Sequence, residues 1–298
     1  MTPPETEPER SQFSQSQARV SQGRVSQARE SQARESPSKE PQARETPSIE
    51  TSSIESQYSD QSASDQSASD QSASDQSDLE HQNLDQAIQE IVELHASLAP
   101  QIEPRLRDFQ RAWEEGDDEG VFRELVFCLL TPQSRARSCW AAVESLTCQG
   151  LVMEGRPEEI HPLLKGVRFK YRKSEYVCLA RETFSRDGKL AIKAVISSLG
   201  DPAGVRDWLV TNVFGMGYKE ASHFLRNVGM GRDLSILDRH ILKNLVRLQV
   251  IDEIPSSLTR KTYLGIEERM REFAARIGVP LDHLDLVLWY RQAGEIFK

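Results

Sequence analysis

Long apolar runs are missing from this 298-residue sequence, and no stretch approaches the roughly 18 apolar residues that a membrane span needs. Cysteine is scarce, and no two of the four cysteines form a CxxC pair: they stand at Cys128, Cys139, Cys148 and Cys178. The spacing of a metal site is therefore absent. Because no signal peptide is recognised either, we expect free or buried thiols in a reducing cytoplasm rather than a disulfide framework.

Strand-like alternation of apolar and polar residues is also hard to find, whereas helical spacing recurs. Four apolar residues of "FRELVFCLL" fall at i, i+3, i+4 and i+7, on one face of a helix: Phe122, Leu125, Val126 and Leu129. Comparable patterns return in Ile88, Ile91, Val92 and Leu98; in Leu237, Ile241, Leu245 and Leu248; and in Tyr263, Ile266, Met270, Phe273 and Ile277. The sequence therefore predicts an all-α fold.

Two helix boundaries carry local signals. Asp201 followed by Pro202 is typical of a helix start, because aspartate caps the first turn and proline fits the first helical position. Gly278, with Pro280 just beyond it, is typical of a helix end.

Residues 1–80 differ sharply from the rest in composition. They are mostly Ser, Gln, Ala, Glu, Asp, Arg and Pro, in five-residue repeats such as "SQARE" and "QSASD". Such a segment buries too little apolar surface to offset its chain entropy, so we expect a disordered tail. A flexible tether, a partner-binding segment and a repeat without function all remain open for it.

Nearly all of the net charge of −9 belongs to this tail. Residues 1–80 hold 7 of the 37 Lys and Arg and 15 of the 46 Asp and Glu, which leaves 30 basic and 31 acidic residues for 81–298. The part expected to fold is nearly neutral, so its charge neither indicates nor excludes a nucleic-acid partner. Its 218 residues suffice for one large domain or two lobes.

The stretch "VFGMGYKEASHFLRNVG" carries the most specific signal. Gly215 and Gly217 allow a tight turn with uncovered amides, and the next helix points its positive dipole end at the same place. With "VRDWLVTNV" as a first helix, the stretch resembles a helix-hairpin-helix, and we expect it to bind phosphate. An ordinary turn between helices, capped by glycine, explains the same residues.

Lys219 stands just behind this turn. An ammonium in the first turn of a helix lies at the unfavourable end of the dipole, which favours the neutral, nucleophilic amine. Asp238, nineteen residues on in "LSILDRHIL", lies where a carboxylate caps a helix, and a short connector allows it to return beside the lysine. It would there orient the amine and stabilise positive charge. A phosphate contact for Lys219 and a plain cap for Asp238 remain the alternatives.

These two stretches, with "FCLLTPQSRA", "GVRFKYRKSEYV" and "DLVLWYRQAGEIFK", closely resemble the archaeal-type 8-oxoguanine DNA glycosylase/AP lyase family of the endonuclease III superfamily. The resemblance covers roughly residues 84–298. It implies two helical subdomains with the hairpin beside a DNA-binding cleft, Lys219 as nucleophile and Asp238 as its acidic partner. It also implies excision of a flipped 8-oxoguanine by attack at C1′, followed by β-elimination that nicks the strand.

The resemblance assigns further residues to DNA. Trp289 and the terminal Lys298 match positions that recognise the base, and Gln133 and Ser134 match a turn that lies against DNA. The residues alone also fit other roles. Trp289 fits core packing, Lys298 fits a frayed chain end, and the turn fits a helix stop at Pro132.

The basic run Arg168, Lys170, Arg172 and Lys173 fits either phosphate contacts or a solvated helix start. His223 and His240 are interpreted as structural histidines.

No cysteine follows Cys178, so the iron-sulfur cluster held by four cysteines in many relatives is not expected, and neither is any other cofactor or metal.

The expected partner is damaged double-stranded DNA. We expect a monomer that acts away from membranes, in the cytoplasm, and on the nucleoid if the source is prokaryotic. A glycosylase for adenine mispairs or oxidised pyrimidines, a non-catalytic DNA-binding module, and a scaffold in which the tail is primary remain alternatives.

Overall fold

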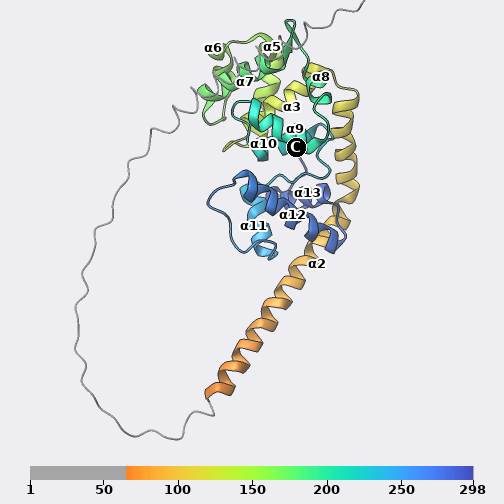
Figure 1. The fold of residues 1–298 in the computed structure, drawn as a ribbon, viewed down its shortest axis with the longest axis vertical. Coiled ribbons are helices and arrows are strands. Elements are labelled where there is room, and N and C mark those ends of the chain that lie inside the picture. The colour runs from red at the N-terminus through yellow and green to blue at the C-terminus, as the bar shows by residue number, and fades with distance from the viewer. Residues whose placement is uncertain (1–64, 298) are drawn as a thin grey trace, which may run out of the picture. The chain divides into compact units, whose positions relative to one another are not determined.

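The computed structural model describes the backbone of residues 65–297 and the side chains of residues 81–297. This part is mostly helical (Figure 1), which confirms the all-α prediction. Within it, no helix is both long enough and apolar enough to cross a membrane. The elements are α2 Asp65–Glu114, α3 Asp118–Leu130, α4 Ala136–Cys148, α5 Leu151–Glu154, α6 Pro157–Ile160, η1 His161–Leu163, α7 Lys170–Phe184, β1 Ser185–Arg186, β2 Lys189–Leu190, α8 Ile192–Ser197, α9 Pro202–Asn212, α10 Tyr218–Asn227, α11 Arg239–Arg247, α12 Arg260–Ile277 and α13 Leu281–Ala293.

The predicted tail falls mostly outside this description. Helix α2 begins at Asp65, and the boundary expected at residue 80 stays a prediction.

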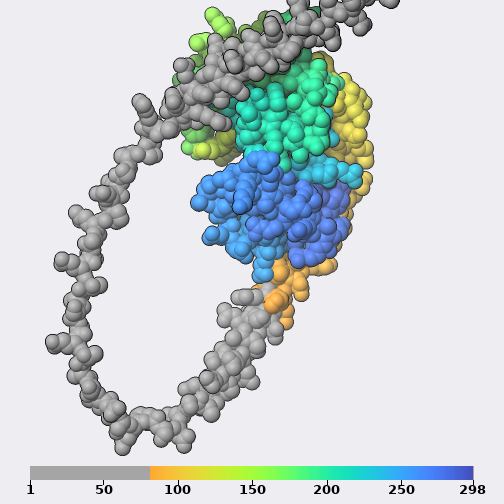
Figure 2. Space-filling view, in the orientation of Figure 1, coloured from red at the N-terminus to blue at the C-terminus, as the bar shows by residue number. Residues whose placement is uncertain are grey.

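Two hydrophobic cores organise the helices, as expected for two helical subdomains. The first core draws its residues from 121–234 and belongs to α3–α10, while the second lies among α11–α13 and the part of α2 that carries Ile91, Leu98 and Ile102. Trp113, near the end of α2, packs against the first core. Figure 1 shows α2 running along both groups, and in Figure 2 the two groups are in close contact.

The helix boundaries that the sequence marked are confirmed. The Asp201 carboxylate accepts the Gly204 N–H at 2.7 Å and caps α9, with Pro202 at the first helical position. Gly278 ends α12 with φ of 70°, in the left-handed region that glycine adopts without a steric cost.

The all-α prediction missed one small element. Strands β1 and β2 pair antiparallel, with Ser185 opposite Leu190 and Arg186 opposite Lys189. Both turn residues, Asp187 and Gly188, have positive φ, which matches the preference of Asp-Gly for two-residue hairpin turns. The Asp187-Gly188 dipeptide was the signal in the sequence that could have predicted this hairpin.

The end of α3 is held by a buried lysine, and here the interpretation of the basic run is wrong for Lys173. Its side chain is buried, and Nζ donates to the carbonyls of Leu130 and Pro132, both at 2.7 Å, and to Ser134 Oγ at 3.2 Å. Carbonyls at a helix C-terminus lack intrahelical donors, and an ammonium satisfies them and complements the dipole. Lys173 therefore fixes the turn between α3 and α4 instead of meeting solvent or phosphate.

Because α2 contributes to both cores, we expect the two groups of helices to unfold together. Leu125→Ala in the first core and Leu245→Ala in the second, both fully buried, should each lower one shared thermal transition, at a cost of about 2–5 kcal/mol. The matched control, Leu179→Ala on the exposed side of α7, should change stability by less than about 0.5 kcal/mol. Calorimetry showing two transitions, of which each core variant moves only one, would contradict this.

Lys173 should give stability a characteristic pH dependence. Burial lowers the pKa of its ammonium to about 8, with the charge of Lys219 contributing in the same direction. An unfolded lysine titrates near ~10.4, so between these values the unfolded chain binds more protons and this residue makes stability rise with pH. Urea unfolding of the native chain and of Lys173→Met should therefore diverge between pH 8 and 10, with the native chain gaining. Parallel curves across that window would show that the fold does not lower the pKa of Lys173.

Candidate active site

The hairpin predicted around the two glycines is present. Helices α9 and α10 pack together and are joined by residues 213–217. Gly215 has φ of 82°, and a Cβ on it would lie 2.3 Å from Cδ2 of Tyr176. Conformation and contact both require glycine at this position.

The second glycine behaves differently from the expectation of uncovered amides. Gly217 is the extended residue before α10, and its N–H donates to Oε2 of Glu220 at 3.3 Å. The expectation is therefore wrong for this amide, which a carboxylate of the same helix caps in the manner of a capping box. The sequence signal for this role of Glu220 was its position three residues after Gly217, the residue that precedes the helix.

Lys219 lies in the first turn of α10 with a partly buried side chain, 22% exposed. Its Nζ donates to Oγ1 of Thr131 at 3.4 Å, and Oε1 of Glu220 lies 3.5 Å away. The Thr131 hydroxyl in turn donates to the carbonyl of Cys128 at 2.8 Å, so its lone pairs face the amine. The amine is thus held at the end of α3, and neither Thr131 nor Glu220 was identified from the sequence.

The turn after α3 presents one of its two predicted DNA residues outward. Gln133 is exposed with φ of 55°, a left-handed conformation that is uncommon outside glycine. The Ser134 hydroxyl, by contrast, donates to the Pro132 carbonyl at 3.3 Å and accepts the Arg168 N–H at 3.0 Å. With the bond from Lys173 in addition, Ser134 joins the turn to the segment before α7.

Asp238 performs the capping role that its position predicted. Its Oδ1 accepts the N–H groups of His240 at 2.7 Å and Ile241 at 2.8 Å at the start of α11. In the described part of the chain its Oδ2 has no hydrogen bond, and no hydrogen bond or ion pair joins Asp238 to Lys219. Their separation is therefore set by the elements that carry them.

The predicted base-recognition residues lie near the end of the chain. Trp289, on α13, is partly buried, and its ring meets that of His240 edge-on with centroids 5.8 Å apart. Trp289 therefore lies beside the first turn of α11, where His240 follows Asp238 by two residues. Lys298 lies outside the described residues, while its neighbour Phe297 packs against the first core below the guanidinium of Arg137.

Within the described residues, no group of three or more His, Cys, Asp or Glu side chains is arranged to hold a metal ion. All four cysteines are free thiols. Burial raises the pKa of the Cys139 thiol to about 11, so its nucleophilic thiolate form is disfavoured. Lys219 is accordingly the better candidate nucleophile beside this turn.

The chain matches a family model described as 8-oxoguanine DNA glycosylase over residues 102–279, which include the hairpin, Lys219 and Asp238. An 8-oxoguanine DNA glycosylase/AP lyase of Fusobacterium nucleatum is 45% identical over 214 residues, 72% of this chain and 99% of that protein.

Solved structures agree with this match. The 8-oxoguanine DNA glycosylase of Thermotoga maritima aligns with a TM-score of 0.65 at 34% identity, over 72% of this chain and all of that one. The 8-oxoguanine glycosylase/lyase of Methanocaldococcus jannaschii, solved with 15mer DNA containing 8-oxoguanine, aligns with a TM-score of 0.63 at 34% identity, over 70% and 99% of the two chains. With hairpin, amine and carboxylate in the matched region, this chain belongs to the 8-oxoguanine DNA glycosylase family.

Proposed function

We propose that this chain is a DNA repair enzyme, an N-glycosylase and AP lyase that removes 8-oxoguanine and nicks the strand at the resulting abasic site. The observation that carries the proposal is the position of Lys219. Its partly buried amine follows the hairpin directly and is oriented by Thr131, in a chain 45% identical to a protein named for this activity. An oriented lysine amine is the group that forms a Schiff base with a sugar aldehyde carbon.

The first chemical step is displacement of the base. The damaged nucleotide leaves the base stack, because its glycosidic bond is inaccessible within the duplex. The neutral Lys219 amine forms a bond to C1′ while the glycosidic bond breaks, and the base departs with the bonding electrons and takes up a proton. Asp238, through the oxygen that does not cap α11, offsets the positive charge that develops on the sugar.

The second step is the lyase reaction. The attached nitrogen gives up one proton, the ring oxygen O4′ takes up a proton as the C1′–O4′ bond breaks, and a protonated imine forms between Nζ and C1′. Removal of a proton from C2′ then expels the 3′ phosphate by β-elimination. Water hydrolyses the imine and releases Lys219 for another round.

The remaining predicted residues act on DNA without entering the chemistry. We assign Gln133 to the gap left by the flipped base, because it is exposed on a rigid turn. The hairpin turn at Gly215 is assigned to backbone phosphates, and Gly217 to shaping that turn, because Glu220 already occupies its amide. Trp289 and Lys298 are assigned to the base itself. Ser134 is assigned to holding the turn that presents Gln133.

Borohydride trapping tests the nucleophile. A duplex with one 8-oxoguanine and a duplex with one abasic site should each yield a covalent adduct with the native chain, and Lys219→Gln should lose both, because the reduced bond is the imine. Lys261→Gln, at an exposed position on α12, is the matched control and should retain both. Adducts that persist in Lys219→Gln would refute the assignment, and an adduct on the abasic duplex alone would place the excision on another base.

Gln133 should matter only when a base has to be flipped. Gln133→Ala is expected to slow excision of 8-oxoguanine about 10-fold, while cleavage of a preformed abasic duplex, which has no base to displace, should stay within about 2-fold. The same substitution at exposed Gln149, at the end of α4, should affect neither reaction. Equal losses on both duplexes would instead make Gln133 a general DNA contact.

A further inference from the structure

The short extended segment before α11 ends at Asp238, and two buried carboxylates hold its backbone. The N–H of Ser235 donates to Oε2 of Glu267 on α12 at 2.8 Å, and the N–H of Ile236 donates to Oδ1 of Asp285 on α13 at 3.3 Å. Consecutive amides, three and two residues before Asp238, are thus fixed by side chains of two different helices.

Each of these carboxylates is paired with an arginine of the hairpin. Arg206, on α9, binds Glu267 through two hydrogen bonds, of 2.6 and 2.9 Å. Arg226, on α10, binds Asp285 at 2.7 Å. All four residues are at most 6% exposed. A buried ion pair is weak evidence for stability, since desolvation cancels much of the attraction, so these pairs call for another explanation.

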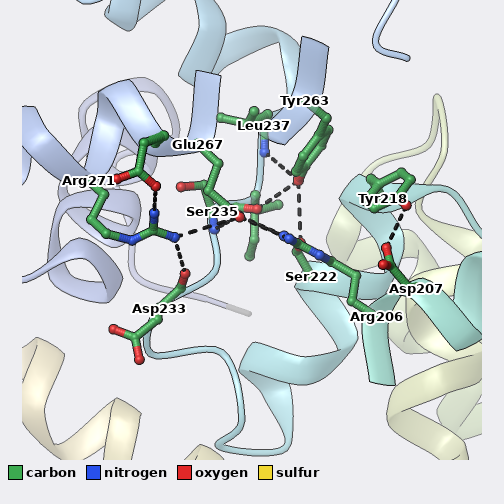
Figure 3. Close-up of polar contacts among 12 residues, drawn as sticks. Arg206, Asp207, Tyr218, Ser222, Asp233, Ser235, Leu237, Tyr263, Glu267 and Arg271 are labelled. Carbon is green, nitrogen blue, oxygen red and sulfur yellow. Dashed lines mark hydrogen bonds and ion pairs between the residues drawn. The ribbon is translucent and has the colours of Figure 1, made fainter. Parts of the chain in front are cut away.

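A tyrosine completes the connection between the segment and the hairpin (Figure 3). The Tyr263 hydroxyl donates to the Ser235 carbonyl at 2.7 Å and accepts the Leu237 N–H at 3.2 Å. Ser222 Oγ lies 3.4 Å from the same hydroxyl and accepts a bond from Arg206 at 3.2 Å. Ser222 is three residues after Lys219 and therefore lies on the same face of α10.

Asp238 is also electrostatically close to this arrangement. Burial raises the pKa of Asp285 to about 6 against the opposing effect of Arg226, and the negative charge of Asp238 contributes in the same direction as burial. Asp238, at the end of the held segment, therefore lies near the ion pair between Arg226 and Asp285.

We propose that the ion pairs Arg206–Glu267 and Arg226–Asp285 are positioning residues, which fix the segment carrying Asp238 against the hairpin carrying Lys219. The two candidate catalytic groups share no direct bond, so their separation depends on this connection. Its arginines come from both hairpin helices, and its carboxylates grip the peptide that leads to Asp238. The inference rests on the proposed function, because it concerns the placement of these groups around one sugar carbon.

The test separates positioning from stability. Glu267→Gln keeps the size and an acceptor oxygen but removes the charge that orients Arg206. We expect single-turnover borohydride trapping on an abasic duplex to slow 10- to 100-fold, because displacements near 1 Å are costly to reaction rates. Binding to a duplex with a reduced, uncleavable abasic site should stay within 2-fold, since no phosphate contact is touched.

Met270→Ala is the matched control, because Met270 is fully buried one turn along α12 and belongs to the second core. It should lower Tm as Glu267→Gln does, with trapping within 3-fold of the native rate. Arg206→Lys, which keeps the charge and loses the paired geometry, is the milder second variant if Glu267→Gln does not fold, and should slow trapping at least 5-fold.

Native trapping rates in Glu267→Gln or Arg206→Lys, or equal slowing in Met270→Ala, would overturn the positioning role while leaving the proposed function intact. Failure of the native chain itself to trap would refute the proposed function instead.

Discussion

The orientation of the Lys219 amine depends on three helices: α10 carries it, α3 ends at its hydroxyl partner, and α7 holds that end of α3. Lys219 leaves the first turn of α10, meets the Thr131 hydroxyl at the end of α3, and has the Glu220 carboxylate beside it. The end of α3 is in turn fixed by Lys173, whose ammonium occupies the carbonyls that a helix leaves unsatisfied. Two lysines therefore contact the same turn. Lys173 is buried and uses all three of its N–H groups, whereas Lys219 is partly exposed.

The same turn also carries Gln133, the residue that we propose fills the gap in the DNA. Gln133 is presented outward only because Ser134 and Lys173 hold the residues around it. On the other side of the amine, Asp238 is placed by a segment whose amides are bonded to buried carboxylates. The proposed nucleophile, its proposed acid partner and the residue assigned to the gap thus stand on separate elements, each fixed by buried polar groups. Such rigidity suits a reaction whose rate depends on the approach of an amine to one carbon.

Local signals predicted much of this from the sequence. Helical spacing gave the long helices, Asp201, Asp238 and Gly278 marked their ends, and two glycines ahead of a lysine indicated the hairpin. Contacts between distant residues were not predictable. Arg206 and Glu267 are 61 positions apart, and nothing near Lys173 distinguishes it from the exposed Arg172 beside it. Thr131 was not identified from the sequence, because its importance comes from an amine 88 residues later.

The most direct test of the central claim is to map the reduced adduct chemically. After borohydride treatment with an 8-oxoguanine duplex, trypsin cannot cut at a lysine whose amine carries the sugar, so the account predicts that the adduct mass appears on the peptide of residues 207–226, uncut at Lys219. An adduct on a peptide containing Lys173, or on the terminal amine of the chain, would contradict the assignment of Lys219 as the nucleophile.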